Sequence, residues 1–313
     1  MKLMREKVMV TPRSVSRDGH PSLQAIVDAG YRLVFPAPGQ QPSEDELIAT
    51  IGECVGYVAG VEPITAAVLG AADKLRVISR NGAGTDNIDL IVAQERNIIV
   101  ERAIGANARG VAELVFGHLL SAARSIPRSD NALKAGRWER IKGRELEGRT
   151  LAVIGYGAVG RIVAKLGHAF DMKVIVHDPF LPKDCSPSPY VEMVTFEFAL
   201  KHADAITLHC PPEKDRYLIG PEELDQIKTG AILVNTARDG LVDLAAVASA
   251  LDSGRLSSFT IDAFSKEPPE NYEFLQKPQV IATPHIGGFT DASVDRAVGI
   301  AVDNLLRILR TTT

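Results

Sequence analysis

The sequence predicts an α/β protein made of two doubly wound parallel-sheet domains. Short apolar runs alternate with helical patterns along the chain, which is typical of parallel sheets covered by helices. A long apolar helical stretch separates two such series. The length of 313 residues is too great for one ordinary core and sufficient for two α/β domains.

The first series contains five apolar runs that read as buried parallel strands. Helical patterns lie between the runs. Ser43, with Glu46 three residues later, predicts that one of these helices begins with a capping box. The runs are KVMV (7–10), YRLVF (31–35), VGYVAG (55–60), LRVIS (75–79) and IIVE (98–101).

A helix is expected over residues 107–126, packed between the domains. A second α/β series follows, and an amphipathic helix in DASVDRAVGIAVDNLLRILR (291–310) ends it. The strand-bearing segments of the second series are RTLAVIGYGAVG (149–160), MKVIVHDP (172–179), ADAITLHCPP (203–212), GAILVNTARDG (230–240), SSFTIDAFSKEPP (257–269) and PQVIATPHIGG (278–288).

Composition and charge exclude several classes of protein. The net charge of −4 and the absence of like-charge runs argue against binding to nucleic acid or acidic membranes. No stretch approaches a membrane span, and the N-terminus lacks the apolar core of a signal peptide. Few, widely spaced cysteines (Cys54, Cys185 and Cys210) favour free thiols in a reducing compartment. We therefore expect a cytoplasmic protein with no metal site.

A glycine-rich turn predicts a dinucleotide site. Gly155, Gly157 and Gly160 form a G-x-G-x-x-G motif between an apolar strand and a helix, and the next strand ends at Asp178. The glycines permit a tight turn, close approach of the pyrophosphate and close helix packing, respectively. The helix N-terminus favours the phosphates. Asp178 would bind the ribose hydroxyls and repel a 2′-phosphate, so NAD is expected rather than NADP. Alternatively, Asp178 only starts the following Asp-Pro turn.

Three polar residues each follow an apolar strand of the second series: Arg238, Glu267 and His285. Because ligands bind beyond the carboxyl ends of parallel strands, all three are expected near the nicotinamide. Histidine suits the proton transfer that accompanies hydride transfer at a hydroxyl-bearing carbon. Glu267 would orient the ring, and Arg238 would clamp a substrate carboxylate. Taken singly, each has a simpler interpretation as a turn, loop or salt-bridge residue. The helical His118 and His168 are expected only to pack.

These motifs, together with GAGTDNIDL, GANARGVAELVFGHLL, LHCPP and LVNTARDGLVD, resemble the D-isomer-specific 2-hydroxyacid dehydrogenase family over nearly the whole chain. The resemblance implies a Rossmann NAD-binding domain (104–288) inserted into a flavodoxin-like substrate domain (1–103 plus 289–313). It implies that His285 is the acid/base, Glu267 its partner and Arg238 a substrate ligand. It also implies a homodimer formed through the helix at 107–126. Further implied cofactor contacts are Ala158, Val159, Cys210, Thr236, Ala237, Asp262, Gly287 and Gly288, and implied substrate contacts are Arg80, Asn81, Gly82 and Ala83.

Within the family, the sequence is most similar in style to short phosphoglycerate dehydrogenases. Members that handle phosphoglycerate usually carry an arginine where this chain has Ala59, so Arg13 or Arg80 would have to compensate. An unphosphorylated substrate such as hydroxypyruvate, glyoxylate or lactate is the alternative. A formate-type enzyme is disfavoured because it would carry glutamine in place of Glu267. An NAD-sensing corepressor would keep the same three residues. No C-terminal regulatory domain is expected.

Overall fold

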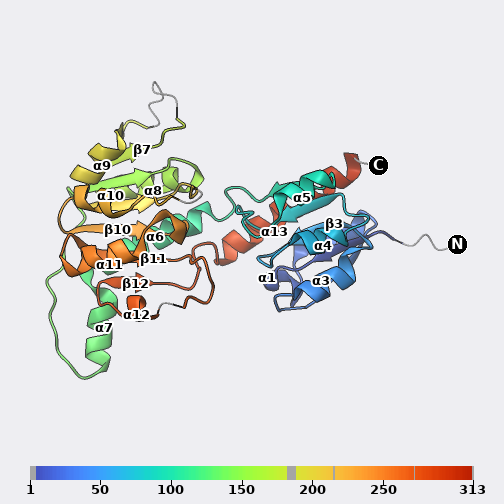
Figure 1. Ribbon diagram of the computed structural model, residues 1–313, viewed down its shortest axis with the longest axis horizontal. Helices are drawn as coiled ribbons and strands as arrows, with labels where there is room; N and C mark the ends of the chain where they lie inside the picture. The colour runs from blue at the N-terminus through green and yellow to red at the C-terminus, as the bar shows by residue number, and fades with distance from the viewer. Residues whose placement is uncertain (1–4, 182–187, 214–215, 271, 312–313) are drawn as a thin grey trace. The chain divides into compact units, whose positions relative to one another are not determined.

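The computed structural model describes residues 5–181, 188–213, 216–270 and 272–311. The chain divides into two compact units, each with its own parallel sheet and covering helices (Figure 1). One unit comprises Met1–Asn107 with Thr290–Thr313, and the other comprises Ala108–Phe289. The fold class predicted from the alternating pattern is confirmed.

The first unit contains a five-stranded sheet in the order β2-β1-β3-β4-β5, with every strand pair parallel. This is the strand order of flavodoxin-like folds, in which the topological switch lies between β1 and β3. Each expected apolar run forms a strand, shifted by no more than a few residues. The strands are β1 (Lys7–Val10), β2 (Arg32–Val34), β3 (Cys54–Ala59), β4 (Val77–Arg80) and β5 (Ile99–Arg102).

Helices cover both faces of this sheet. The C-terminal helix α13 (Asp291–Thr311) packs along β3, β4 and β5 and shares a core with β1 and α2. The opposite core contains side chains of α3, α4 and α5. The predicted capping box is present, because the Ser43 side chain and Glu46 satisfy each other's backbone N–H groups at the start of α3. The remaining helices are α1 (Arg13–Ser16), η1 (Pro21–Leu23), α2 (Gln24–Asp28), α3 (Glu44–Ile51), α4 (Ala66–Gly70) and α5 (Leu90–Glu95).

The second unit contains a seven-stranded parallel sheet in the order β12-β11-β10-β9-β6-β7-β8. The first strand in sequence, β6, lies inside the sheet, and the strand order reverses between β6 and β9, as in a Rossmann fold. The carboxyl ends of all seven strands therefore share one edge. The strands are β6 (Thr150–Ile154), β7 (Lys173–His177), β8 (Val191–Met193), β9 (Ala205–Leu208), β10 (Ala231–Asn235), β11 (Leu256–Ile261) and β12 (Val280–Ala282).

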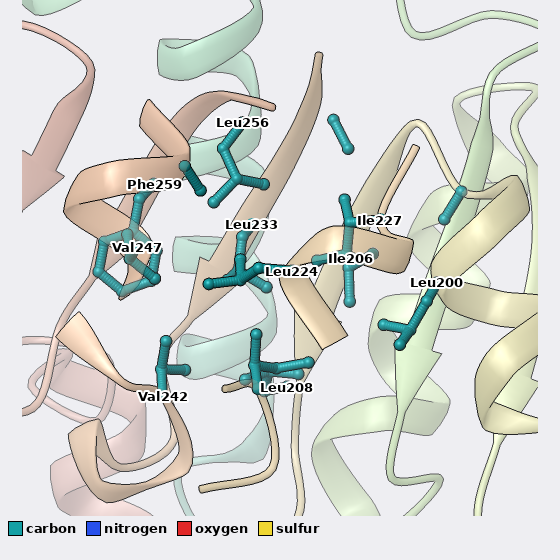
Figure 2. Packing of buried hydrophobic residues seen from close by; sticks show 14 of the residues in the cluster. Leu200, Ile206, Leu208, Leu224, Ile227, Leu233, Val242, Val247, Leu256 and Phe259 are labelled. Carbon is teal, nitrogen blue, oxygen red and sulfur yellow. The ribbon is translucent and has the colours of Figure 1, made fainter. Parts of the chain in front are cut away.

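Two apolar cores fix this sheet between its helices. One core joins the sheet to α6 and α8. Figure 2 shows part of the other, where Leu224 of α10 and Val247 of α11 pack near Leu233 and Phe259 of the sheet. The helices are α6 (Ala108–Arg124), α7 (Ile126–Lys134), α8 (Ala158–Ala169), α9 (Phe196–His202), α10 (Pro221–Gln226), η2 (Asp239–Leu241), α11 (Leu244–Asp252) and α12 (Tyr272–Leu275).

Cys54 and Cys210 are free cysteines, whereas Cys185 lies outside the described residues. Burial raises the pKa of Cys54 to about 11, so its thiol stays protonated at neutral pH. Among the described helices, none combines the length and the apolar character needed to cross a bilayer.

Candidate active site

The glycine-rich turn joins β6 to α8 at the carboxyl edge of the seven-stranded sheet. Gly155 has a φ of 94°, and a Cβ there would lie 2.7 Å from the backbone of His209. A Cβ on Gly160 would lie 2.0 Å from the carbonyl oxygen of Gly155. Both positions therefore require glycine for the turn itself.

Gly157 has a different requirement. It caps the N-terminus of α8, it is exposed, and a Cβ built there would have no neighbour within 4 Å. Nothing in the described protein explains the missing side chain. The space instead lies where the free N–H groups of the first helical turn, including those of Ala158 and Val159, can receive an anion.

Asp178 directly follows β7 and is half-buried. Its Oδ2 accepts a hydrogen bond from the N–H of Tyr156, at 2.8 Å, and its Oδ1 accepts one from the N–H of Phe180, at 3.0 Å. The carboxylate is therefore fixed against the glycine-rich turn and also begins the Asp-Pro turn. The structure therefore shows the turn contact of Asp178, and its contact with the ribose hydroxyls stays a prediction.

The loop after β9 carries Cys210 next to the glycine-rich turn. Burial lowers the pKa of the neighbouring His209, whose Nε2 lies 2.9 Å from Oγ1 of Thr207. Burial is also the main cause that raises the pKa of the Cys210 thiol, which keeps it in the less reactive protonated form.

The loop after β10 carries Thr236, Ala237 and Arg238. Asn235 at the end of β10 fixes the conformation of this loop, a role that was not predicted from the sequence. Its Nδ2 donates to the carbonyl of Arg238 at 2.7 Å, and its Oδ1 accepts from the N–H of Ala237 at 3.1 Å. Arg238 is half-buried and donates from Nη1 to the carbonyl of Ala237. Oγ1 of Thr236 is buried and has no hydrogen-bond partner among the described residues. Such an atom is a candidate for a ligand contact.

His285 and Glu267 come together although they follow different strands. Nδ1 of His285 lies 2.7 Å from Oε1 of Glu267, and the same oxygen accepts a hydrogen bond from the N–H of Phe264 at 3.1 Å. The two side chains are 46% and 42% exposed, so the pair can reach a ligand from solvent. A carboxylate at Nδ1 fixes the orientation of the ring.

The turn that carries His285 is held by a buried carboxylate. His285 has a φ of 53°, a left-handed conformation that non-glycine residues adopt uncommonly and histidine more readily than most. Asp262 is 1% exposed, and it accepts hydrogen bonds from the N–H groups of Ile286, at 2.9 Å, and Gly287, at 2.8 Å. Its backbone carbonyl accepts from the N–H of His285 at 2.8 Å. Asp262 therefore determines where the imidazole is presented.

Two further members of this network were not predicted from the sequence. The hydroxyl of Thr283 donates to Oδ1 of Asp262 at 2.5 Å, and Nε2 of His118 lies 3.0 Å from Oγ1 of Thr283. A hydroxyl has one hydrogen to give, so Nε2 of His118 is the donor in the second contact. His118 packs in α6 as expected, with 2% exposure, but it also extends the network. A histidine inside an apolar helix was the available signal.

The predicted substrate loop, residues 80–83, begins at Arg80, the last residue of β4, in the other unit. Arg80 is buried and donates from Nε to Oδ1 of Asn87, at 3.3 Å, and from Nη1 to the carbonyl of Asn81, at 3.0 Å. A Cβ on Gly82 would lie 3.1 Å from Nη1 of Arg80. Among the described residues, no group of three or more His, Cys, Asp or Glu side chains is placed to hold a metal ion.

Comparison with known proteins agrees with this geometry. Residues 116–287 match the family model described as "D-isomer specific 2-hydroxyacid dehydrogenase, NAD binding domain". A D-3-phosphoglycerate dehydrogenase from Methanocaldococcus jannaschii is 41% identical over 273 residues, covering 86% of this chain and 52% of the relative. The chain thus spans about half the length of that protein.

Two further relatives match over most of their length. A hydroxypyruvate reductase from Thermotoga maritima is 41% identical over 264 residues, covering 82% of this chain and 85% of the relative. A crystal structure of D-lactate dehydrogenase from Aquifex aeolicus, complexed with NAD and lactic acid, superposes with a TM-score of 0.82 at 26% identity, covering 97% of this chain and 96% of that one. The chain belongs to the D-isomer-specific 2-hydroxyacid dehydrogenase family.

Proposed function

We propose that the protein is an NAD-dependent dehydrogenase of small 2-hydroxy acids, which it interconverts with 2-keto acids. The observation that carries this proposal is the His285–Glu267 pair, which lies at the same sheet edge as the glycine-rich turn. A proton-transfer group beside a dinucleotide site is what hydride exchange at a carbinol carbon requires.

Residues of the second unit fit NAD. The open space at Gly157 and the first turn of α8 would accept the pyrophosphate, and Asp178 would accept hydrogen bonds from the ribose hydroxyls. The unpartnered hydroxyl of Thr236 supports a contact on the same edge. When bound, the cofactor supplies or accepts the hydride. We assign further cofactor contacts to Ala158, Val159, Cys210, Ala237, Asp262, Gly287 and Gly288.

His285 would donate or accept the proton that accompanies the hydride. In keto-acid reduction, C2 gains a hydride, and its carbonyl oxygen takes the proton from Nε2 of His285 while Nδ1 keeps its contact with Glu267. The carboxylate of Glu267 keeps the ring oriented for the transfer. In the oxidation direction the ring receives the hydroxyl proton instead.

Arg238 would hold the substrate carboxylate with its planar donor groups and polarise the adjacent carbonyl. Asn235 fixes the loop on which Arg238 stands. The backbone N–H groups of residues 80–83 would provide a further carboxylate contact, with the first unit acting as the substrate domain.

We also propose that the protein is a cytoplasmic homodimer. Support for self-association comes from α7 and the following segment, which extend away from the seven-stranded sheet in Figure 1. They expose Ile126 by 51%, Leu133 by 59% and Trp138 by 82%. Free thiols at Cys54 and Cys210 suit a reducing compartment. Light scattering of the purified chain tests the dimer, and a monomer mass would contradict it.

The test of the activity is NADH oxidation, followed by absorbance, with hydroxypyruvate, glyoxylate and pyruvate as separate substrates. We expect saturable turnover of at least one of them, and the reverse reaction with the corresponding 2-hydroxy acid and NAD. NADH binding without turnover of any 2-keto acid would contradict the enzymatic proposal and favour a sensor of the cofactor.

A further inference from the structure

A buried carboxylate lies in the loop after β3. Glu62 is 1% exposed, and its Oε1 accepts hydrogen bonds from the hydroxyl of Tyr57, at 2.5 Å, from the N–H of Gly60, at 2.8 Å, and from the hydroxyl of Thr11. An ionised carboxylate only accepts hydrogen bonds, and three donors directed at one oxygen match that form. Glu62 therefore introduces a negative charge into the interior of the first unit.

This charge lies at the topological switch point of the five-stranded sheet. Thr11 directly follows β1 and Gly60 directly follows β3, and these two strands are neighbours. After β1 the chain continues to β2, which lies on one side of this pair of strands, and after β3 it continues to β4, which lies on the other side. In open parallel sheets, ligands bind beyond the carboxyl ends of the strands at this point.

The loop after β3 encloses the Glu62 side chain and is hydrogen-bonded to the loop that follows β4. A Cβ on Gly60 would lie 2.6 Å from Oε2 of Glu62, so the glycine makes room for the carboxylate. Asn87 donates from Nδ2 to the carbonyl of Glu62 at 2.7 Å and accepts from Nε of Arg80 at 3.3 Å. Glu62 and the predicted carboxylate-binding loop at 80–83 thus belong to one hydrogen-bonded assembly.

Opposite charges influence the same buried hydroxyl in this assembly. Burial and the neighbouring Glu62 carboxylate raise the pKa of Tyr57, while the charge of Arg80 lowers it by less. Ala59, which pairs in register with Arg80, is fully buried and contributes no charge. Glu62 and Arg80 thus bring opposite charges close to the same buried hydroxyl.

We propose that Glu62 is a specificity-determining residue that excludes phosphorylated substrates and restricts the site to unphosphorylated 2-keto acids. This inference rests on the proposed dehydrogenase function. A phosphate group adds a charge of about −1.5 to −2 at neutral pH, which the Glu62 carboxylate would repel in a poorly solvated position. A substrate carrying only its carboxylate can be held by the N–H groups of residues 80–83.

Glu62→Gln tests the charge separately from the shape, because glutamine keeps the size and one acceptor oxygen. With NADH, kcat/KM is measured for hydroxypyruvate and phosphohydroxypyruvate in the wild type and the variant. We expect the wild type to favour hydroxypyruvate. The variant should raise the ratio of kcat/KM for the phosphorylated acid to that for hydroxypyruvate by about tenfold. The exposed Glu95 ends α5, ahead of β5, and Glu95→Gln should leave both values unchanged.

A wild-type measurement covers the case in which the variant does not fold. A phosphate ester loses one charge below a pKa of about 6, whereas hydroxypyruvate keeps its charge across this range. The ratio of kcat/KM for the phosphorylated acid to that for hydroxypyruvate should therefore rise several-fold from pH 7.5 to pH 5.5. Taking the ratio cancels any titration of the enzyme that affects both substrates.

Several results would overturn the inference. A wild-type preference for the phosphorylated acid would do so. An equal fall in kcat/KM for both substrates in Glu62→Gln would also do so, because it would show that Glu62 only stabilises the loop. A ratio that stays flat or falls on acidification would contradict it too. Absence of turnover with both of these acids and also with glyoxylate and pyruvate would contradict the proposed function itself, and this inference with it.

Discussion

Nε2 of His118 in α6 lies 3.0 Å from Oγ1 of Thr283, so the long helix is hydrogen-bonded to the turn that presents His285. Thr283 in turn donates to Asp262, which accepts the N–H groups of Ile286 and Gly287. His118 is therefore a positioning residue, which acts on the imidazole of His285 through Thr283 and Asp262.

Replacing His118 should lower kcat with little change in KM. In His118→Leu, Thr283 loses a donor and the turn is less well fixed, so we expect kcat for hydroxypyruvate to fall by about tenfold. His118→Gln keeps an N–H donor close to the Nε2 position and should recover most of the loss. Steady-state kinetics and thermal melting of both variants are compared with the wild type. Equal kcat values for His118→Leu and the wild type, at similar melting temperatures, would refute the positioning role of His118.

Glu267 should position the ring of His285. Glu267→Ala removes the oxygen that lies 2.7 Å from Nδ1 of His285, so the ring is no longer held in one orientation and kcat for hydroxypyruvate should fall by about tenfold. Glu270→Ala shortens an exposed side chain that pairs with Lys266, and its kcat should match the wild type. Steady-state kinetics of both variants check this, and an unchanged kcat in Glu267→Ala would contradict the positioning role.

Asp178 should control the choice between NADH and NADPH. Asp178→Asn removes the charge and keeps an oxygen that can accept the N–H of Tyr156. Without the carboxylate, a 2′-phosphate is no longer repelled, and we expect the NADPH/NADH ratio of kcat/KM to rise by about tenfold. The two cofactors are titrated at a fixed concentration of hydroxypyruvate. An unchanged ratio would leave Asp178 as a turn residue only.

The two glycines at 157 and 160 should respond differently to alanine. A Cβ at Gly157 meets nothing in the described protein, so Gly157→Ala should cost no more than about 1 kcal/mol of stability and raise the KM for NADH by about tenfold. A Cβ at Gly160 would clash with Gly155, so Gly160→Ala should cost several kcal/mol. Chemical denaturation and NADH titration separate the two effects. Unaltered NADH affinity in Gly157→Ala would exclude the pyrophosphate from that space.

The fold could be predicted because its signals are local. Each strand is a short apolar run and each sheet is parallel, so alternation with helical patterns was sufficient. The glycine-rich motif could be recognised because its residues are close in sequence. The network around the His285 turn could not, because His118 and Thr283 lie 165 residues apart and meet only after folding. The inward orientation of Glu62 was equally hidden, since an acidic loop residue is ordinarily solvated.

The variant His285→Asn tests whether His285 transfers the proton. Asparagine tolerates the left-handed backbone of this position, so His285→Asn removes the imidazole without straining the turn. NADH binding, followed by fluorescence, and steady-state reduction of hydroxypyruvate are measured on the same preparation. We predict unchanged NADH affinity and a loss of kcat of about 10²- to 10⁴-fold. A kcat within tenfold of the wild type would contradict the assignment of His285 as the acid/base.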